Sequence, residues 1–242
     1  MKRFALLAAL LLMTTAAQAQ NFFTTTPSHS GDSIFTIGPR LSSYSTDVDL
    51  GPSTFETGRQ TAFGLVGGYR SGAFVLDFNF DHDPEGGLDV IDLFGFEDYS
   101  RDRFEAAVGW SALPVLDLQA GIRLDQISVG GFFSSEVLDP DDVEFQGLAF
   151  GGTLHTPQNR PFGVYGTGRY YVGTAEFADS PRGRNEFDAT GWRVEGGVSI
   201  PLGESNWSVV PGAEYEQLEI ETGDFRLDTN RFFINFVWSS GR

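Results

Sequence analysis

The chain has 242 residues, no cysteine and a formal net charge of −17. The lack of cysteine excludes disulfides and thiolate chemistry, and an acidic chain without a basic patch argues against a nucleic-acid partner. After the N-terminus, no segment approaches the ~20 apolar residues of a membrane helix. The hydropathy remains compatible with a membrane protein built from strands, because the polar lumen of a barrel masks its apolar outer face.

Residues 1–19 have the order of a secretory signal peptide. Lys2 and Arg3 precede an apolar run at 4–13, and the small-residue pattern of a signal peptidase site follows at 17–19. The apolar run is too short to remain as a membrane-spanning helix. We therefore predict export and cleavage, which leaves 223 residues, the size of one all-β domain, with a net charge of −19.

Residues 20–32 are short and polar, and we expect a flexible periplasmic lead-in. The first strand is predicted at 33–44, and a polar loop follows at 45–56. Residues 62–81 then contain two strictly alternating runs separated by a turn at 70–72. Period-two alternation indicates strands, because successive side chains point to opposite sides of a pleated backbone.

The same design repeats along the chain. Further strands are expected at 101–112, 115–128, 144–154, 162–174, 189–200, 207–219 and 229–238. Long and short connections alternate between them, so that all long loops lie at one end of a meander. We predict an all-β, antiparallel up-and-down transmembrane barrel of about ten strands over residues 33–238, with eight strands as the alternative and a C-terminal tail at 239–242.

One face of these strands is apolar, and the other carries charges of both signs. If the apolar face meets lipid, the lumen holds Asp77, Arg103, Glu105, Asp117, Arg123, Arg169, Arg193, Glu195, Glu214, Glu216 and Arg231. A cation at the midplane of the lipid face costs roughly 2–4 kcal/mol, which favours this orientation over a soluble, lipocalin-like barrel. Because Lys2 is the chain's only lysine, all lumen cations are arginines. Arginine suits a crowded polar interior, although genomic base composition explains the bias equally well.

Three tryptophans and one tyrosine fall near the short-turn ends of their strands, where an aromatic girdle would meet the membrane interface: Trp110, Trp207, Trp238 and Tyr69. The chain resembles the small outer-membrane β-barrel family, the OmpA/OmpX-like group. The segment NRFFINFVW at 230–238 is similar to the aromatic-terminated last strand that the outer-membrane assembly machinery reads, although this chain continues for four more residues. The resemblance implies the outer membrane of a Gram-negative-type bacterium.

Outer-membrane barrels also include hydrolases, so we searched for catalytic groups. The best cluster is Asp81-His82-Asp83 at the long-loop end of a strand. Adjacent strand residues point to opposite faces, so Asp81 and His82 are not expected to enter the lumen together. The acidic stretch 139–142 with Glu144 lacks the spacing of a calcium loop. We therefore predict no catalytic residue, cofactor or metal.

The long connection at 87–99 is unusually apolar, with Leu88, Val90, Ile91, Leu93, Phe94 and Phe96. These residues either pack together on extended strands or form a surface for a partner. The sequence favours a non-enzymatic structural or binding barrel that is not a general porin. Its expected partners are outer-membrane lipid, lipopolysaccharide, the assembly machinery and a surface ligand or envelope protein. The alternative is an outer-membrane hydrolase, a protease or lipid-modifying enzyme, with its site at the extracellular rim.

Overall fold

The structure is a computed structural model that describes residues 33–50, 54–56, 59–83, 98–130, 142–156, 162–177, 185–221 and 225–240. No helix long and apolar enough to cross a membrane occurs in these ranges. Eleven strands form there: β1 (Ser33–Leu50), β2 (Thr54–Glu56), β3 (Gln60–Ser71), β4 (Phe74–His82), β5 (Asp98–Leu113), β6 (Leu116–Gly130), β7 (Asp142–His155), β8 (Gly163–Phe177), β9 (Asn185–Pro201), β10 (Trp207–Ile220) and β11 (Phe225–Ser239).

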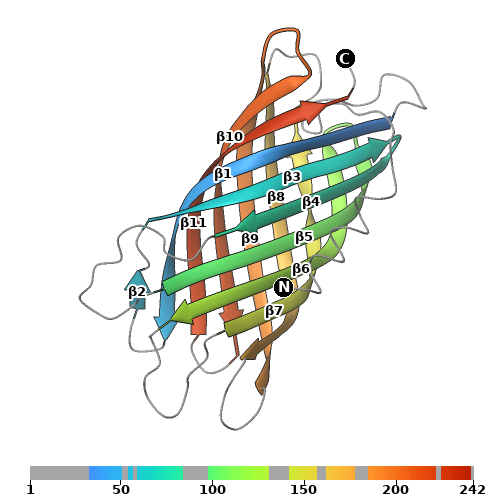
Figure 1. Ribbon diagram of the computed structural model, residues 1–242. Helices are drawn as coiled ribbons and strands as arrows, with labels where there is room; N and C mark the ends of the chain where they lie inside the picture. Colours follow the sequence, from blue (N-terminus) through green and yellow to red (C-terminus); the bar gives the residue numbers. More distant parts are fainter. Residues whose placement is uncertain are drawn as a thin grey trace.

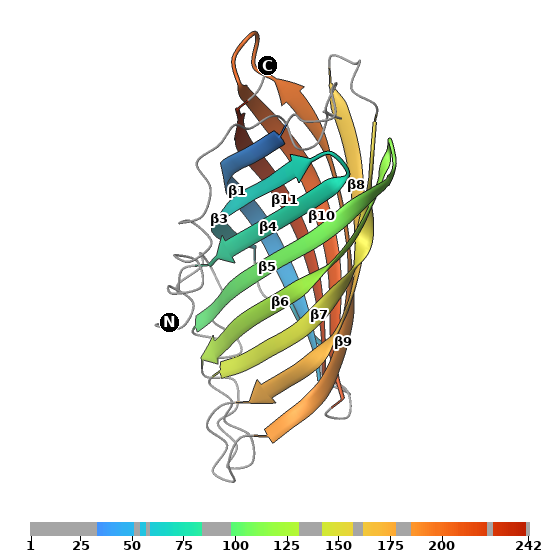
Figure 2. The same cartoon turned by 90° about the vertical axis from the view of Figure 1, so that its right-hand side faces the viewer.

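Ten of these strands form a closed antiparallel barrel (Figures 1 and 2). Each strand from β3 to β11 pairs with the next along the chain, β1 pairs with β3, and the barrel closes where β1 meets β11. The closing register runs from Thr36 opposite Ser239 to Leu50 opposite Phe225. β2 pairs only with β1, beyond the point where β3 begins. The predicted ten-stranded up-and-down barrel is therefore confirmed.

The two ends of the barrel differ in their connections. At one end, short turns join β3 to β4, β5 to β6 and β9 to β10, and β11 finishes at this same end (Figure 1). We call this the short-turn end, and the opposite one the long-loop end. The predicted turn at 70–72 is displaced, because Arg70 and Ser71 belong to β3 and Gly72 makes the turn with a φ of 57°. Glycine suits this position because a side chain is disfavoured at positive φ.

The strands extend further at the long-loop end than the sequence predicted. The expected loop at 45–56 is wrong over 45–50, which continues β1, and over 54–56, which forms β2. β8 and β9 likewise extend at this end beyond the strands predicted at 162–174 and 189–200. Polar residues join these strand ends because a neighbouring strand supplies backbone partners; Asp47, for example, lies between Asp228 and Glu56.

The faces of the strands follow the predicted alternation. Large apolar side chains cover the outside, including Phe232 and Trp110, which are 65% and 63% exposed, whereas thirteen arginines and carboxylates of strands β1, β3 to β6 and β9 to β11 are under 5% exposed inside. This is the inverse of a soluble barrel, which buries its apolar face. An apolar outer surface around a charged interior is the arrangement of a transmembrane β-barrel.

Aromatic side chains mark both ends of the apolar outer surface. At the short-turn end Trp207 lies opposite Trp238, and Trp110 lies opposite Phe74. Toward the long-loop end, a second group packs Trp192 against Tyr215, with ring centroids 5.0 Å apart. Indole and phenol rings prefer membrane interfaces, so these two groups fit the two borders of the bilayer.

The interior is layered along the barrel axis. Toward the long-loop end it holds an apolar cluster, here called the long-loop cluster, whose fully buried members include Phe145, Ile127 and Leu218. A smaller apolar group, with Val66, Tyr165 and Phe233, lies nearer the short-turn end. Charged side chains occupy the middle of the lumen and reach the short-turn end, where Arg70 pairs with Asp117.

Candidate functional site: the charged layer of the lumen

The structure places all eleven predicted lumen charges on the inner face. Nine of them are buried, and Asp77 and Glu195 are slightly more exposed, at 18% and 11% of their side-chain surface. Five further ionisable residues join them. Together they form what we call the charged layer, whose members all make ion pairs: Arg40, Arg70, Arg101, Arg103, Arg123, Arg169, Arg193, Arg231, Asp77, Asp81, Glu105, Asp117, Asp125, Glu195, Glu214 and Glu216. Eight positive charges thus face eight negative ones.

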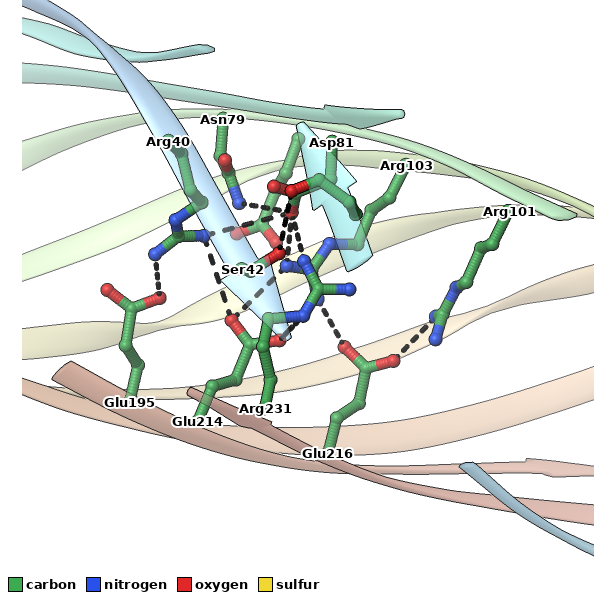
Figure 3. Close-up of polar contacts among 12 residues, drawn as sticks. Arg40, Ser42, Asn79, Asp81, Arg101, Arg103, Glu195, Glu214, Glu216 and Arg231 are labelled. Atoms are coloured by element: carbon green, nitrogen blue, oxygen red, sulfur yellow. Dashed lines mark hydrogen bonds and ion pairs between the residues drawn. The ribbon is translucent and has the colours of Figure 1, made fainter. Parts of the chain in front are cut away.

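Asp81 of β4 is the centre of one half of this layer (Figure 3). Its Oδ2 accepts hydrogen bonds from Nη2 of Arg103 and from Nη1 of Arg231, each at 2.6 Å. Nη1 of Arg40 approaches the same oxygen to 3.7 Å. Three guanidinium groups from β1, β5 and β11 therefore converge on one carboxylate, which ties the closing seam of the barrel to the opposite part of the wall.

Two glutamates of β10 extend the network across the lumen (Figure 3). Arg103 donates from Nη1 to Oε1 of Glu214 at 2.6 Å and to Oε2 of Glu216 at 3.0 Å. Oε1 of Glu216 also accepts from Nη2 of Arg101 at 2.6 Å and from Nη2 of Arg123 at 2.8 Å. Glu214 and Glu216 face the same way because they are two residues apart on one strand.

Glu105 of β5 links a third group of strands. Arg193 binds its two oxygens, with Nη1 at 2.8 Å from Oε2 and Nη2 at 3.1 Å from Oε1, and Arg169 contacts Oε1. The hydroxyl of Tyr171 donates to Oε2 at 3.1 Å. One carboxylate therefore serves two arginines that lie directly opposite each other on β8 and β9.

Aromatic rings complete the surroundings of the arginines. The guanidinium carbon of Arg40 lies 4.1 Å from the ring centre of Phe233, and that of Arg123 lies 4.3 Å from the ring centre of Tyr171. A planar guanidinium can stack on a ring and bind carboxylates through its edge at the same time, which an ammonium group cannot do. The charged layer is closely packed, and Arg103, Arg123 and Glu105 are each no more than 1% exposed.

Sequence reasoning left five members out of the candidate list. Arg40 and Asp125 lie within the strands predicted at 33–44 and 115–128 but were not assigned to the lumen, and Asp81 was considered only as a partner of His82. Arg70 was expected in a turn, and Arg101 at the start of a strand. For Arg101 and Asp125 the missing signal was simple, because both continue the inward period-two series of Arg103 and Arg123.

The histidine of the predicted cluster, His82, does not point into the lumen. His82 lies on the outer face, 53% exposed, and its Nδ1 is 2.6 Å from Oδ1 of Asp102. Asp81 faces inward, as expected, and Asp83 is buried and accepts a hydrogen bond from Tyr44. The carboxylate beside His82 is therefore that of Asp102, on the neighbouring strand.

His155 lies one residue beyond the strand predicted at 144–154, and this predicted strand end is wrong. It is the last residue of β7, its side chain is only 6% exposed, and its Nε2 lies 3.5 Å from Oδ2 of Asp117. The same carboxylate binds Arg70 and accepts a hydrogen bond from Ser111 at 2.6 Å. The inward series of β7 continues to its end, which carries His155 into the barrel.

Several predicted features lie outside the described residues: the signal peptide at 1–19, the lead-in at 20–32, the apolar loop residues within 88–96, and residues 139–141 of the acidic stretch. Asp142 and Glu144 begin β7, and Glu144 is exposed. Within the described part of the chain, no group of three potential metal ligands comes together. Ser239 of the expected tail belongs to β11.

Comparisons with known proteins return barrels of this general kind. No family model matches the sequence, and no curated protein is similar to it at a significant level. Structural matches include the outer membrane protease OmpT of Escherichia coli (13% identity, 89% of this chain and 99% of that chain, TM-score 0.45). They also include the Neisserial surface protein A (11%, 84% and 96%, 0.41) and the β domain of the Bordetella autotransporter BrkA (13%, 84% and 99%, 0.41). Similarity this low carries no argument about function. The barrel itself confirms the predicted resemblance at the level of architecture.

Proposed function

We propose that this protein is a non-enzymatic barrel of the outer membrane, with a lumen closed to solutes and a binding or structural role at the cell surface. The observation that carries this proposal is the charged layer, in which ion pairs from opposite walls meet across the lumen. Ten strands enclose little more space than eight, whose side chains fill the interior. The ion pairs between Arg103 and Glu214 and between Arg123 and Glu216 use this space for contacts instead of a channel.

The orientation follows from the two ends of the barrel. Outer-membrane barrels have short turns in the periplasm and long loops outside. The short-turn end, with the end of β11, therefore faces the periplasm, and the aromatic last strand is available to the assembly machinery during insertion. The long loops face the outside, where lipopolysaccharide, a surface ligand or another envelope protein is the partner. The apolar residues of 88–96 are the proposed contact surface.

Conductance tests the closed lumen. We expect the refolded protein to show heat-modifiable gel mobility and a strand-dominated circular dichroism spectrum, and to give no large, stable openings in planar bilayers. Regular porin-like openings by the wild type would refute the closed lumen.

The role of the loop is tested separately. Deletion of residues 88–96 should abolish capture of the surface partner while the barrel still folds.

A second candidate function rests on one contact, the 2.6 Å approach of His82 to Asp102 at the rim, because a carboxylate can orient an imidazole as a general base. We expect no turnover of peptide, phospholipid or lipid A substrates by the wild type. Turnover that disappears in His82→Ala and in Asp102→Asn would establish the hydrolase instead. Arg226→Gln, an exposed change on another strand, is the matched control.

A further inference from the structure

A small cavity lies inside the barrel, in its short-turn half. Its volume is about 70 Å³, and its lining includes the last inward residues of β7 together with Arg169 and Arg193. A site of this size has room for a few water molecules or one small ion, and it excludes a sugar or an acyl chain. The cavity adjoins the charged layer, and two of its lining residues, Arg40 and Arg193, also pair with Glu214.

Two arginines on one side of this cavity have an unusual arrangement. Arg169 and Arg193 are directly opposite each other on β8 and β9, and both bind the single carboxylate of Glu105. Like charges directly opposite each other on neighbouring strands destabilise a sheet. Asp77 compensates only in part, since its Oδ2 lies 3.4 Å from Nη2 of Arg169 and also accepts from Gln119.

The unused hydrogen-bonding groups of the lining are mostly donors. Among the described residues, Nε of Arg169, Nε of Arg193 and Nη1 of Arg40 have no hydrogen-bond partner, although all three groups are buried. Oδ1 of Asn79 is the only unused acceptor of the lining in that part of the chain. Buried donors without partners are costly, and the residues that carry these donors line a space that can hold an acceptor.

We propose that this cavity binds a small oxyanion, held chiefly between Arg169 and Arg193. A phosphate or carboxylate group supplies several acceptor oxygens and a negative charge. It would satisfy the unused donors and separate the two guanidinium groups. Hydrogen bonds from arginine to an oxyanion are charge-assisted and stronger than those to neutral acceptors. This inference goes beyond the proposed surface role and does not depend on it.

The test uses the full chain refolded in detergent micelles, with unfolding followed against the concentration of inorganic phosphate or acetate. Chloride at the same ionic strength is the reference, because a ligand that binds only the folded state raises its stability in a saturable way. We expect a saturable rise of the unfolding temperature with at least one of the two oxyanions. Arg169→Gln and Arg193→Gln should require at least about tenfold more anion for the same rise.

Two further variants separate binding from general damage. Arg101→Gln removes a charge of the layer that does not line the cavity, and it should respond to the anion like the wild type. Thr167→Leu keeps every arginine but fills the cavity, and it should lose the response. If the arginine variants fail to fold, Thr167→Leu alone decides. The proposal is overturned if neither oxyanion exceeds chloride in the wild type, which would mean that water occupies the cavity, or if Thr167→Leu responds as the wild type does.

Discussion

The charged layer and the long-loop cluster fill the same lumen in opposite ways. In the charged layer, the single side chain of Arg103 pairs with three carboxylates, those of Asp81, Glu214 and Glu216. Each charged group there depends on several others. In the long-loop cluster, Leu218 and Phe145 are equally buried but hold no charge. Loss of one apolar group leaves a cavity, whereas loss of one ion leaves its partners buried and unpaired. The two layers should therefore differ in how they respond to a single substitution.

The largest effect is expected for Arg103→Met, which keeps the side-chain volume but removes the cation shared by three carboxylates. Breaking a buried ion network by removing one partner costs about 3–5 kcal/mol. Urea unfolding in detergent, followed by tryptophan fluorescence, measures this loss. A change below about 1 kcal/mol would show that water or rearranged neighbours compensate, and would remove the contrast between the two layers.

Leu218→Ala should cost no more than this, about 2–5 kcal/mol, because only transfer and cavity terms are lost. Leu218 is fully buried in the long-loop cluster. The same unfolding measurement applies. In planar bilayers the variant should stay closed, since the charged layer remains intact. Stable openings of Leu218→Ala would instead show that the long-loop cluster is what closes the lumen.

Gly64→Ala tests how tightly the charged layer is packed against the wall. A Cβ at Gly64 would come within 2.4 Å of the carbonyl oxygen of Phe80 and 2.6 Å of Oδ1 of Asp81. Overpacking of this kind costs about 1–3 kcal/mol. Gly168→Ala is the matched control, because nothing lies within 4 Å of its Cβ position. Equal unfolding midpoints for the two variants would contradict close packing around Asp81.

The smallest effect is expected for Arg226→Gln. Arg226 pairs with Asp228 at 2.7 Å, but its side chain is 42% exposed. Exposed ion pairs contribute about 0–1 kcal/mol. The free energies of unfolding of Arg226→Gln and of Arg103→Met, measured separately, therefore compare an arginine–carboxylate pair outside the barrel with one inside it. A loss as large as that of Arg103→Met would mean that burial is not what makes the charged layer vulnerable.

The alternation of residues determined most of the architecture. Trp110 and Trp207 were predicted on the outside and Arg193 and Glu214 on the inside, and the structure agrees, because a period of two leaves each side chain only one face. Strand ends were less predictable. Polar residues such as Asp47 lie in β1 because a partner strand, distant in sequence, is present to pair with them.

Tertiary structure alone decided which charges meet. Arg231 and Asp81 are 150 residues apart, and Arg40 and Glu195 are 155 apart. The sequence assigned most of these groups to a face, but their depth in the barrel depends on strand tilt and register, which no local pattern encodes. The contact between His82 and Asp102 likewise depends on the register of β4 and β5, and the cavity beside Arg169 and Arg193 became visible only once the strands were closed into a barrel.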